Sequence, residues 1–425
     1  MSRRPISFIR VIVAAFISGF VSLLFVSPSW AIDNAPADAA VINVRTNNCI
    51  ENGVEVANCF TTMANVEDWL RDVRQTGPTR PTLVQIGPGS FVSHFVCNFS
   101  NVTLQGSGRS QTILNSAGQL AGMEIYGACT AFDVQDLTVD ASQANVWGIF
   151  FNVGGDWEGV TTWTNVDIIG PGYGWLEAAT TCTQRKGRNL FFGSRISTSA
   201  IANDGISRAY QAACAQSWFW GSEITANVSP QDTVDAFALK AINAEVHLYG
   251  SNVRLLLSPG VPAKSFDGNN GHYLMAALSG SSVHIHGTGL DVVHEGSGTA
   301  DMLYADSTSH FHANESGFNI HVTGTGKVNR VAGPGSVETP YMWGAGIVPP
   351  LSTSSSGVQT LASRNGMDSY IETDCPFSST AACSAGAGLP VGSQYPRLMV
   401  YRKECTGTGP NQGPWFDTIQ RNCRN

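Results

Sequence analysis

Charged side chains are scarce in this 425-residue chain, because Asp, Glu, Lys and Arg together make up 13% of it, about half of the usual share. The formal net charge is −8, which argues against a nucleic-acid partner. Glycine is abundant at 45 residues, and 43% of the chain is hydrophobic, more than globally disordered chains carry. A surface covered by Ser, Thr, Asn and Gly is typical of stacked strands joined by tight turns.

Long apolar runs are also missing once the first 31 residues are set aside. Arg3, Arg4 and Arg10 precede the apolar run 11–25, and Ser-Trp-Ala31 fits the small-x-small rule of signal peptidase sites. We therefore expect a signal peptide over 1–31, cut after Ala31, and a secreted or periplasmic mature chain without a membrane span. Removal of its three arginines changes the formal charge from −8 to −11.

No two of the ten cysteines have the Cys-x-x-Cys spacing that many zinc sites use. In an exported chain an even number of cysteines indicates disulfides, although sequence alone leaves their connectivity open. The most economical pairing joins neighbours along the chain: Cys49–Cys59, Cys97–Cys129, Cys182–Cys214, Cys375–Cys383 and Cys405–Cys423.

One short sequence motif recurs through the middle of the chain. Its clearest copies are Trp218-Phe-Trp-Gly-Ser-Glu-Ile and His247-Leu-Tyr-Gly-Ser-Asn-Val. The last position of the motif recurs every 28 to 37 residues, at Val102, Leu137, Val166, Ile196, Ile224, Val253, Leu290 and Phe318. Such a period indicates a stack of similar units.

Each repeat holds two or three short β-rich runs separated by Gly, Asn, Ser or Asp, with no room for long helices, so an all-β solenoid is predicted. Ahead of the repeats, Met63, Val66, Leu70 and Val73 have helical spacing, which predicts a helix over about 61–77 that covers the first unit.

A family resemblance begins at this helix. The helix is followed by Val84-Gln-Ile-Gly-Pro-Gly-Ser-Phe, Asn101-Val-Thr-Leu-Gln-Gly-Ser-Gly and Thr112-Ile-Leu. This succession resembles the opening of right-handed parallel β-helix proteins of the pectin-lyase-like superfamily, and is most similar to pectinesterases. The resemblance covers residues 60–325 as architecture, and its specific part covers 60–115.

The resulting division of the mature chain has three parts. Residues 32–324 are expected to form the right-handed parallel β-helix with its capping helix. Residues 325–366, rich in Pro and Ser, are expected to be a linker or wrapping segment. Residues 367–425, with four cysteines and strand-like runs at 368–373, 397–402 and 415–419, are expected to form a small disulfide-tied β module.

Alternation of inward and outward side chains within the motif predicts an outward strip of aromatic and histidine side chains. One column holds Leu190, Trp218, His247, His284 and His312, and the other holds Phe192, Trp220, Tyr249, His286 and Asn314. Aromatic rings suit sugar rings, so Trp218, Trp220, Tyr249, His247, His284 and His286 are the predicted polysaccharide-binding residues. The alternative is that other segments cover the strip and make it ordinary core.

Eight of the nine histidines lie within 247–321, and adjacent rungs of such a stack are about 4.8 Å apart. These histidines could hold a transition metal, but stacked polar ladders in solenoids are more often structural, so no metal site is predicted. No cofactor is predicted either, because no helix follows Gly106-Ser-Gly108 to complete a phosphate cradle.

Acid–base chemistry has only weak candidates. Paired carboxylates of a glycosidase lie about 5 to 9.5 Å apart, and Asp204, Glu223, Asp232 and Asp235 are near the strip in sequence. Lyase chemistry needs a base beside a cation. Arginines and one lysine that could serve are Arg185, Lys186, Arg188, Arg195 and Arg208.

The catalytic signatures of the resembling families are missing. The pectinesterase pattern Gly-x-x-Asp-Phe-Ile-Phe-Gly, the polygalacturonase trio and a pectate-lyase calcium cluster are not found. Two function classes are therefore kept. The first is a polysaccharide-active lyase, esterase or hydrolase, and the second is a non-catalytic surface or matrix protein that uses the same face for glycan or cell adhesion.

Overall fold

The structure is a computed structural model. It describes residues 35–347 except 36, 47, 76–79, 117, 155, 180, 200–205, 231–234, 262–270, 298, 315, 323–326, 333–335 and 339–341. Beyond residue 347 it describes the strands at 358–362, 369–374 and 398–402. The predicted signal peptide and the pairs Cys375–Cys383 and Cys405–Cys423 lie outside these residues. No helix in the described part of the chain is long and apolar enough to cross a membrane.

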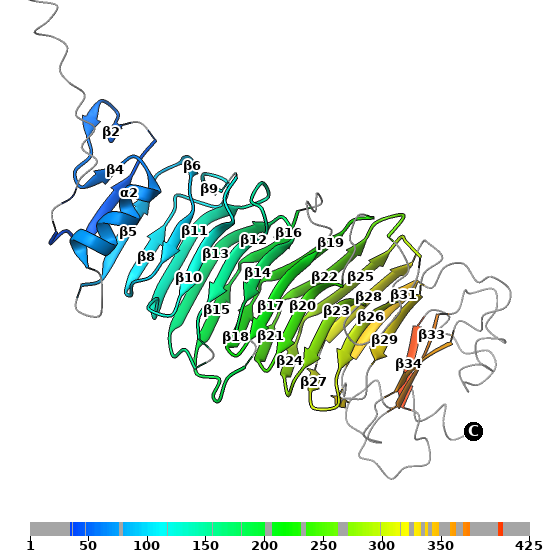
Figure 1. Ribbon diagram of the computed structural model, residues 1–425. Helices are drawn as coiled ribbons and strands as arrows, with labels where there is room; N and C mark the ends of the chain where they lie inside the picture. Colours follow the sequence, from blue (N-terminus) through cyan, green and yellow to red (C-terminus); the bar gives the residue numbers. More distant parts are fainter. Residues whose placement is uncertain are drawn as a thin grey trace, which may run out of the picture.

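The chain winds into successive coils whose strands pair in parallel with those of the next coil, which confirms the predicted parallel β-helix (Figure 1). Each regular coil contributes one strand to each of three faces, named A, B and C here. Faces A and B belong to one sheet of 20 described strands, because two long strands, β11 (Ala131–Asp140) and β13 (Val160–Gly170), run through both.

Face A consists of the first halves of β11 and β13 together with strands that pair in register from coil to coil. These strands are β1 (Val41–Val44), β5 (Thr82–Ile86), β8 (Val102–Gln105), β15 (Arg188–Phe192), β18 (Gln216–Trp220), β21 (Glu245–Tyr249), β24 (Ser282–His286), β27 (His310–Asn314) and β30 (Ser336–Glu338).

Face B follows face A across a tight turn in each coil. Besides the second halves of β11 and β13 it contains β6 (Gly89–Val92), β9 (Thr112–Asn115), β16 (Arg195–Thr198), β19 (Glu223–Val228), β22 (Asn252–Leu257), β25 (Gly289–His294), β28 (Ser316–Val322) and β31 (Met342–Ile347).

Face C is a separate sheet of nine described strands. It contains β7 (Phe95–Cys97), β10 (Ala121–Tyr126), β12 (Trp147–Asn152), β14 (Tyr173–Glu177), β17 (Arg208–Ala213), β20 (Ala236–Ile242), β23 (His272–Leu278), β26 (Thr299–Ala305) and β29 (Lys327–Ala332).

The recurring sequence motif forms the turn from face A to face B. Its glycine has a left-handed backbone, with φ of +56° at Gly193, Gly221, Gly250 and Gly287, a conformation that costs an ordinary residue about 1–2 kcal/mol. The serine that follows is buried and bonds to the next coil: the Ser194 N–H donates to Ser222 Oγ at 3.2 Å. The glycine thus adopts the backbone conformation of the turn, and the serine hydroxyl accepts a hydrogen bond from a buried backbone N–H of the neighbouring coil.

A helix covers the N-terminal end, as predicted for 61–77 (Figure 1). It begins as α2 (Met63–Asp68), capped by the Thr62 side chain, and continues as a π-helical segment η1 (Trp69–Arg74). Met63, Val66, Trp69 and Leu70 are buried under it. Nearby, the short strand β4 (Cys59–Phe60) pairs with β1, and β2 (Ile50–Glu51) forms a hairpin with β3 (Val54–Glu55).

The stack continues past residue 324, because β29, β30 and β31 add a further coil within the segment expected to be a linker. The prolines of this segment lie between its strands, so they do not prevent pairing. Farther on, β32 (Val358–Ala362), β33 (Ser369–Asp374) and β34 (Leu398–Arg402) form an antiparallel sheet. The strand expected at 415–419 lies outside the described residues.

Candidate polysaccharide-binding face

The two predicted columns lie side by side on the outside of face A. Strand pairing places Leu190, Trp218, His247, His284 and His312 in one column and Phe192, Trp220, Tyr249, His286 and Asn314 in the other. Between the columns, Phe191, Phe219, Leu248, Ile285 and Ala313 point inward and have no exposed surface. The ten residues of the two columns are called the aromatic strip below.

The rings of the strip stack on one another from coil to coil. The rings of Trp218, His247 and His284 are stacked and nearly parallel, with ring centres 5.2 and 4.6 Å apart. In the second column Phe192, Trp220, Tyr249 and His286 stack at 4.7, 5.9 and 5.2 Å. Because most ring faces are turned toward a neighbouring ring, the strip presents mainly ring edges to solvent, and Phe192 is its most exposed ring at 37%.

A third outward column, which the sequence analysis missed, follows one edge of the strip. It contains the first residues of the same strands: Arg188, Gln216, Glu245, Ser282 and His310. The alternation that predicted the other two columns also places these residues outward, two positions earlier. The Arg188 guanidinium lies 5.8 Å from the Trp218 ring, and Gln216 Nε2 donates to Glu245 at 3.2 Å.

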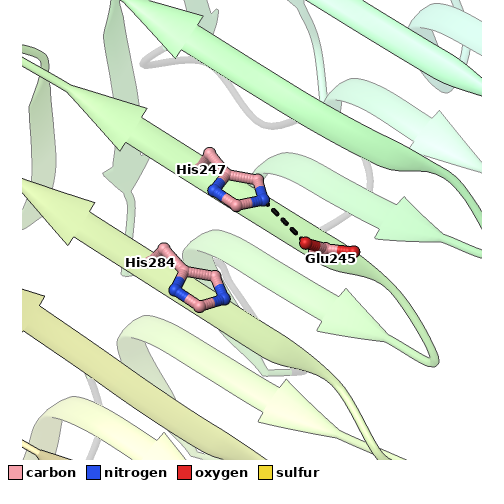
Figure 2. Close-up of side chains that lie close together, drawn as sticks. All are labelled: Glu245, His247 and His284. Atoms are coloured by element: carbon pink, nitrogen blue, oxygen red, sulfur yellow. Dashed lines mark hydrogen bonds and ion pairs between the residues drawn. The ribbon is translucent and has the colours of Figure 1, made fainter.

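Histidines of the strip take part in a polar network with this third column. Glu245 Oε1 and His247 Nε2 are 2.8 Å apart (Figure 2). Ser282 Oγ lies 2.9 Å from His284 Nε2 and 2.7 Å from His310 Nε2. Burial, followed by repulsion from His247 and His310, lowers the pKa of His284 to about 4. His284 is therefore neutral at physiological pH.

An open hollow of about 400 Å³ adjoins the N-terminal end of the same face. Its lining includes Leu83, Thr103 and Asp133, which occupy successive outward positions of the column that continues through Thr162 to Leu190. The hollow and the strip are thus parts of one outer surface.

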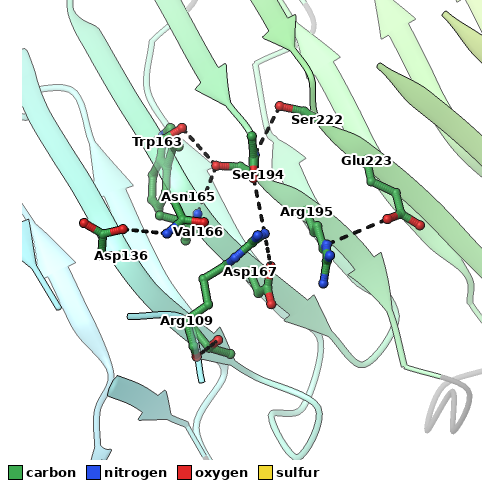
Figure 3. A network of polar contacts seen from close by, with 12 residues as sticks. Arg109, Asp136, Trp163, Asn165, Val166, Asp167, Ser194, Arg195, Ser222 and Glu223 are labelled. Carbon is green, nitrogen blue, oxygen red and sulfur yellow. Dashed lines mark hydrogen bonds and ion pairs between the residues drawn. The ribbon is translucent and has the colours of Figure 1, made fainter. Parts of the chain in front are cut away.

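Two of the acid–base candidates lie on a different face from the strip. Glu223 and Arg195 project from face B, where Glu223 Oε2 is 3.8 Å from Arg195 Nε (Figure 3). Glu223 Oε1 is 3.6 Å from Arg254. In the neighbouring coils Arg109 pairs with Asp167 at 2.9 Å. Glu223 and Arg195 are thus paired with neighbouring charges, and pairs as exposed as these contribute little to stability.

Asp235 and Arg208 meet on face C. The Asp235 side chain is 4% exposed and accepts hydrogen bonds from the Arg208 guanidinium and, at 3.3 Å, from Lys240 Nζ. The Arg208 guanidinium also lies 5.1 Å from the Tyr173 ring and 5.5 Å from the Phe237 ring. Asp204 and Asp232 lie outside the described residues.

A buried carboxyl that the sequence analysis missed sits inside the coils. Glu177 accepts hydrogen bonds from Asn189 Nδ2 at 2.8 Å and from the Tyr210 hydroxyl at 3.2 Å. Burial nevertheless raises the pKa of Glu177 to about 8. It faces the interior and belongs to the core rather than to the candidate site.

No protein-family model matches this chain, and no curated protein sequence matches it. Solved structures similar to it include a pectin methylesterase from Erwinia chrysanthemi, at 15% identity and a TM-score of 0.37 over 60% of this chain and 80% of that one. The pectate lyase Pel9A is 11% identical, with a TM-score of 0.40 over 70% and 80%. An alginate lyase from Paenibacillus sp. str. FPU-7 is 9% identical, with a TM-score of 0.35 over 66% and 97%.

Proposed function

We propose that this protein is exported and binds an extended polysaccharide along the aromatic strip of face A. The observation that carries the proposal is the strip itself: two aligned columns over five consecutive coils, in which eight of the ten positions hold partly exposed aromatic or histidine side chains. Sugars would contact the apolar ring edges and bond to the indole, phenol and imidazole groups along the row.

The regular spacing of the strip suits a polymer. Equivalent side chains recur at the separation of paired strands, roughly 4.8 Å, so a linear chain lying along the stack meets similar groups at each coil. The hollow beside Asp133 lies in line with the strip and lengthens the surface available to such a chain.

The positions of the carboxylates favour binding over hydrolysis at this face. Glu223 lies across the turn on face B between two arginines, and Asp235 lies on face C beneath Arg208 and Lys240. Neither stands on face A with the strip, and Glu245 at the edge of the strip is already hydrogen-bonded to Gln216 and paired with His247. A glycosidase instead places two carboxyl groups within about 9.5 Å of each other around the bond that it cleaves.

A second candidate function is lyase or esterase chemistry on face C. It is favoured by one observation, the contact of two cations, Arg208 and Lys240, with the single carboxylate of Asp235. Incubation with a polysaccharide panel, followed by assays for unsaturated products and released ester groups, tests it. Product formation that is lost in Asp235→Asn would support this function, and no product with any polysaccharide would reject it.

Affinity gel electrophoresis against neutral and acidic polysaccharides tests the binding function. The double variant Trp218→Ala/Trp220→Ala should lose retardation by at least one polysaccharide that retards the wild type. Trp147→Ala is the matched control, because Trp147 is also half-buried and stacked, on Phe150 at 4.3 Å, but lies on face C. Retardation by no polysaccharide, or equal losses in the two variants, would reject the proposal.

Export is a separate part of the proposal and has its own test. The expected leader, with three arginines ahead of the apolar run 11–25, should be removed after Ala31. N-terminal sequencing of protein from the periplasm or medium should begin at Ile32. Recovery of the full chain from the cytoplasm alone would contradict export.

A further inference from the structure

One edge of the aromatic strip brings nitrogen and oxygen ligand atoms of three side chains together. The ligand atoms of Glu245, His247 and His284 all lie within 4.8 Å of one another (Figure 2). They come from two paired strands, β21 and β24, in which His247 is directly opposite His284. The parallel ladder fixes the positions of their backbones.

Two further groups surround this cluster. Ser282 Oγ lies between His284 Nε2 and His310 Nε2, at 2.9 and 2.7 Å, so the two imidazole nitrogens face the same hydroxyl. His310 stands on β27, the next strand of the ladder, and is exposed. Ser282, which pairs with Glu245 in the ladder, therefore links His310 to His284 of the cluster.

We propose that Glu245, His247 and His284 bind one divalent transition-metal ion of the zinc type. Imidazole nitrogen suits Zn²⁺, Cu²⁺ and Ni²⁺, whereas Ca²⁺ and Mg²⁺ prefer oxygen ligands. This inference does not depend on the binding of a polysaccharide.

The geometry needs only side-chain adjustment to accept the ion. Zinc bonds of about 2.0–2.2 Å in a tetrahedral site leave ligand atoms roughly 3.3 Å apart. Glu245 and His247 are already 2.8 Å apart in a hydrogen bond whose proton the metal would replace. The His247 and His284 rings are stacked with an angle of 8° between them, so both must tip toward the ion, which rotation of their side chains allows.

Solvation also favours the site. Glu245 is 30% exposed in its side chain and His247 15%, so an ion could enter from solvent and would find its partners partly desolvated.

The test uses the mature chain without a polyhistidine tag, stripped with a chelator and then titrated with Zn²⁺ by isothermal titration calorimetry. We expect one ion per chain, a higher melting temperature in its presence, and no competition from excess Ca²⁺. His284→Gln and, as a second variant, Glu245→Gln should each weaken Zn²⁺ binding at least tenfold.

His286→Gln is the matched control, since His286 is on the same strand and the same face but in the other column of the strip, stacked on Tyr249. It should bind Zn²⁺ as the wild type does. Failure of the wild type to bind one ion, affinity unchanged in folded His284→Gln and Glu245→Gln, or an equal loss in His286→Gln would each overturn the proposal. Circular dichroism of each variant verifies folding.

Discussion

Glu177 shows how one side chain can make the stability of the fold depend on pH. Glu177 is 1% exposed, and its carboxyl accepts hydrogen bonds from Asn189, Tyr210 and the Ala213 N–H. These bonds lower its pKa, but burial has the larger effect and raises it from 4.5 to about 8. The folded chain therefore binds a proton here that the unfolded chain releases at neutral pH.

Removal of this titration should change the pH profile of unfolding. For a carboxyl whose folded pKa is raised, stability is complete below pH 4.5 and is lost as pH rises through about 8. The free energy of unfolding of the wild type should thus fall between pH 5 and pH 9 relative to that of Glu177→Gln, by on the order of a few kcal/mol. Urea unfolding of both proteins at the two pH values measures this, and parallel changes with pH would contradict it.

Sequence could not identify Glu177, because two rules disagree there. Strand alternation places Glu177 inward together with Trp175, whereas composition places carboxylates on the surface. Only the Asn189 and Tyr210 partners, supplied by other strands, resolve the disagreement. The interior position of Phe219 or Leu248, by contrast, follows from alternation and hydrophobicity together, and the structure confirms it.

At the scale of the element, the turn between faces A and B is the part of the repeat with the strictest backbone demand. Gly193, Gly221 and Gly250 all have φ of +56° with space for a Cβ atom. Asp136 and Asn165 adopt almost the same φ, 53° and 55°, at the corresponding turns of β11 and β13. Asp and Asn tolerate this conformation better than other residues that carry a Cβ atom.

Substitutions at Gly221 should separate backbone strain from packing. Because a Cβ atom at Gly221 would meet nothing within 4 Å, Gly221→Ala should cost only the left-handed backbone term, about 1–2 kcal/mol. Gly221→Asn should cost less than half as much. Chemical denaturation of both variants makes the comparison, and equal costs would show that the turn relaxes to another conformation.

The same turn explains which part of the candidate site could be predicted. The strip residues were predicted correctly as columns because strands of one face repeat with a steady period. Glu223 is only three residues from Trp220, but the turn at Gly221 moves it onto face B. Closeness in sequence is therefore a poor guide to its position. The same holds for Asp235, which directly precedes β20 and lies against Arg208 of face C.

At the scale of the whole molecule, disulfides join the chain to itself at coil spacing. The predicted pairs Cys49–Cys59, Cys97–Cys129 and Cys182–Cys214 are present, and the last two each span 32 residues, about one coil. Their cysteines lie at or just beyond the ends of face C strands in adjacent coils.

Loss of one such link should destabilise the stack measurably. Replacement of Cys182 and Cys214 by Ser should lower the free energy of unfolding by about 3–4 kcal/mol, as expected for a closed loop of this length. Urea unfolding of the double variant beside the wild type under non-reducing conditions measures the loss. A variant as stable as the wild type would mean that the coils hold their register without the link.

The most direct test of the account measures affinity against oligosaccharide length. Leu190 and His312 are four coils apart, roughly 19 Å at the spacing of paired strands. For a polysaccharide that binds, calorimetry should show affinity rising with each added sugar until the oligosaccharide spans this distance, with the rise lost in Trp218→Ala/Trp220→Ala and kept in Trp147→Ala. A disaccharide that binds as tightly as the polymer, or a length dependence unchanged in Trp218→Ala/Trp220→Ala, would contradict binding along the strip.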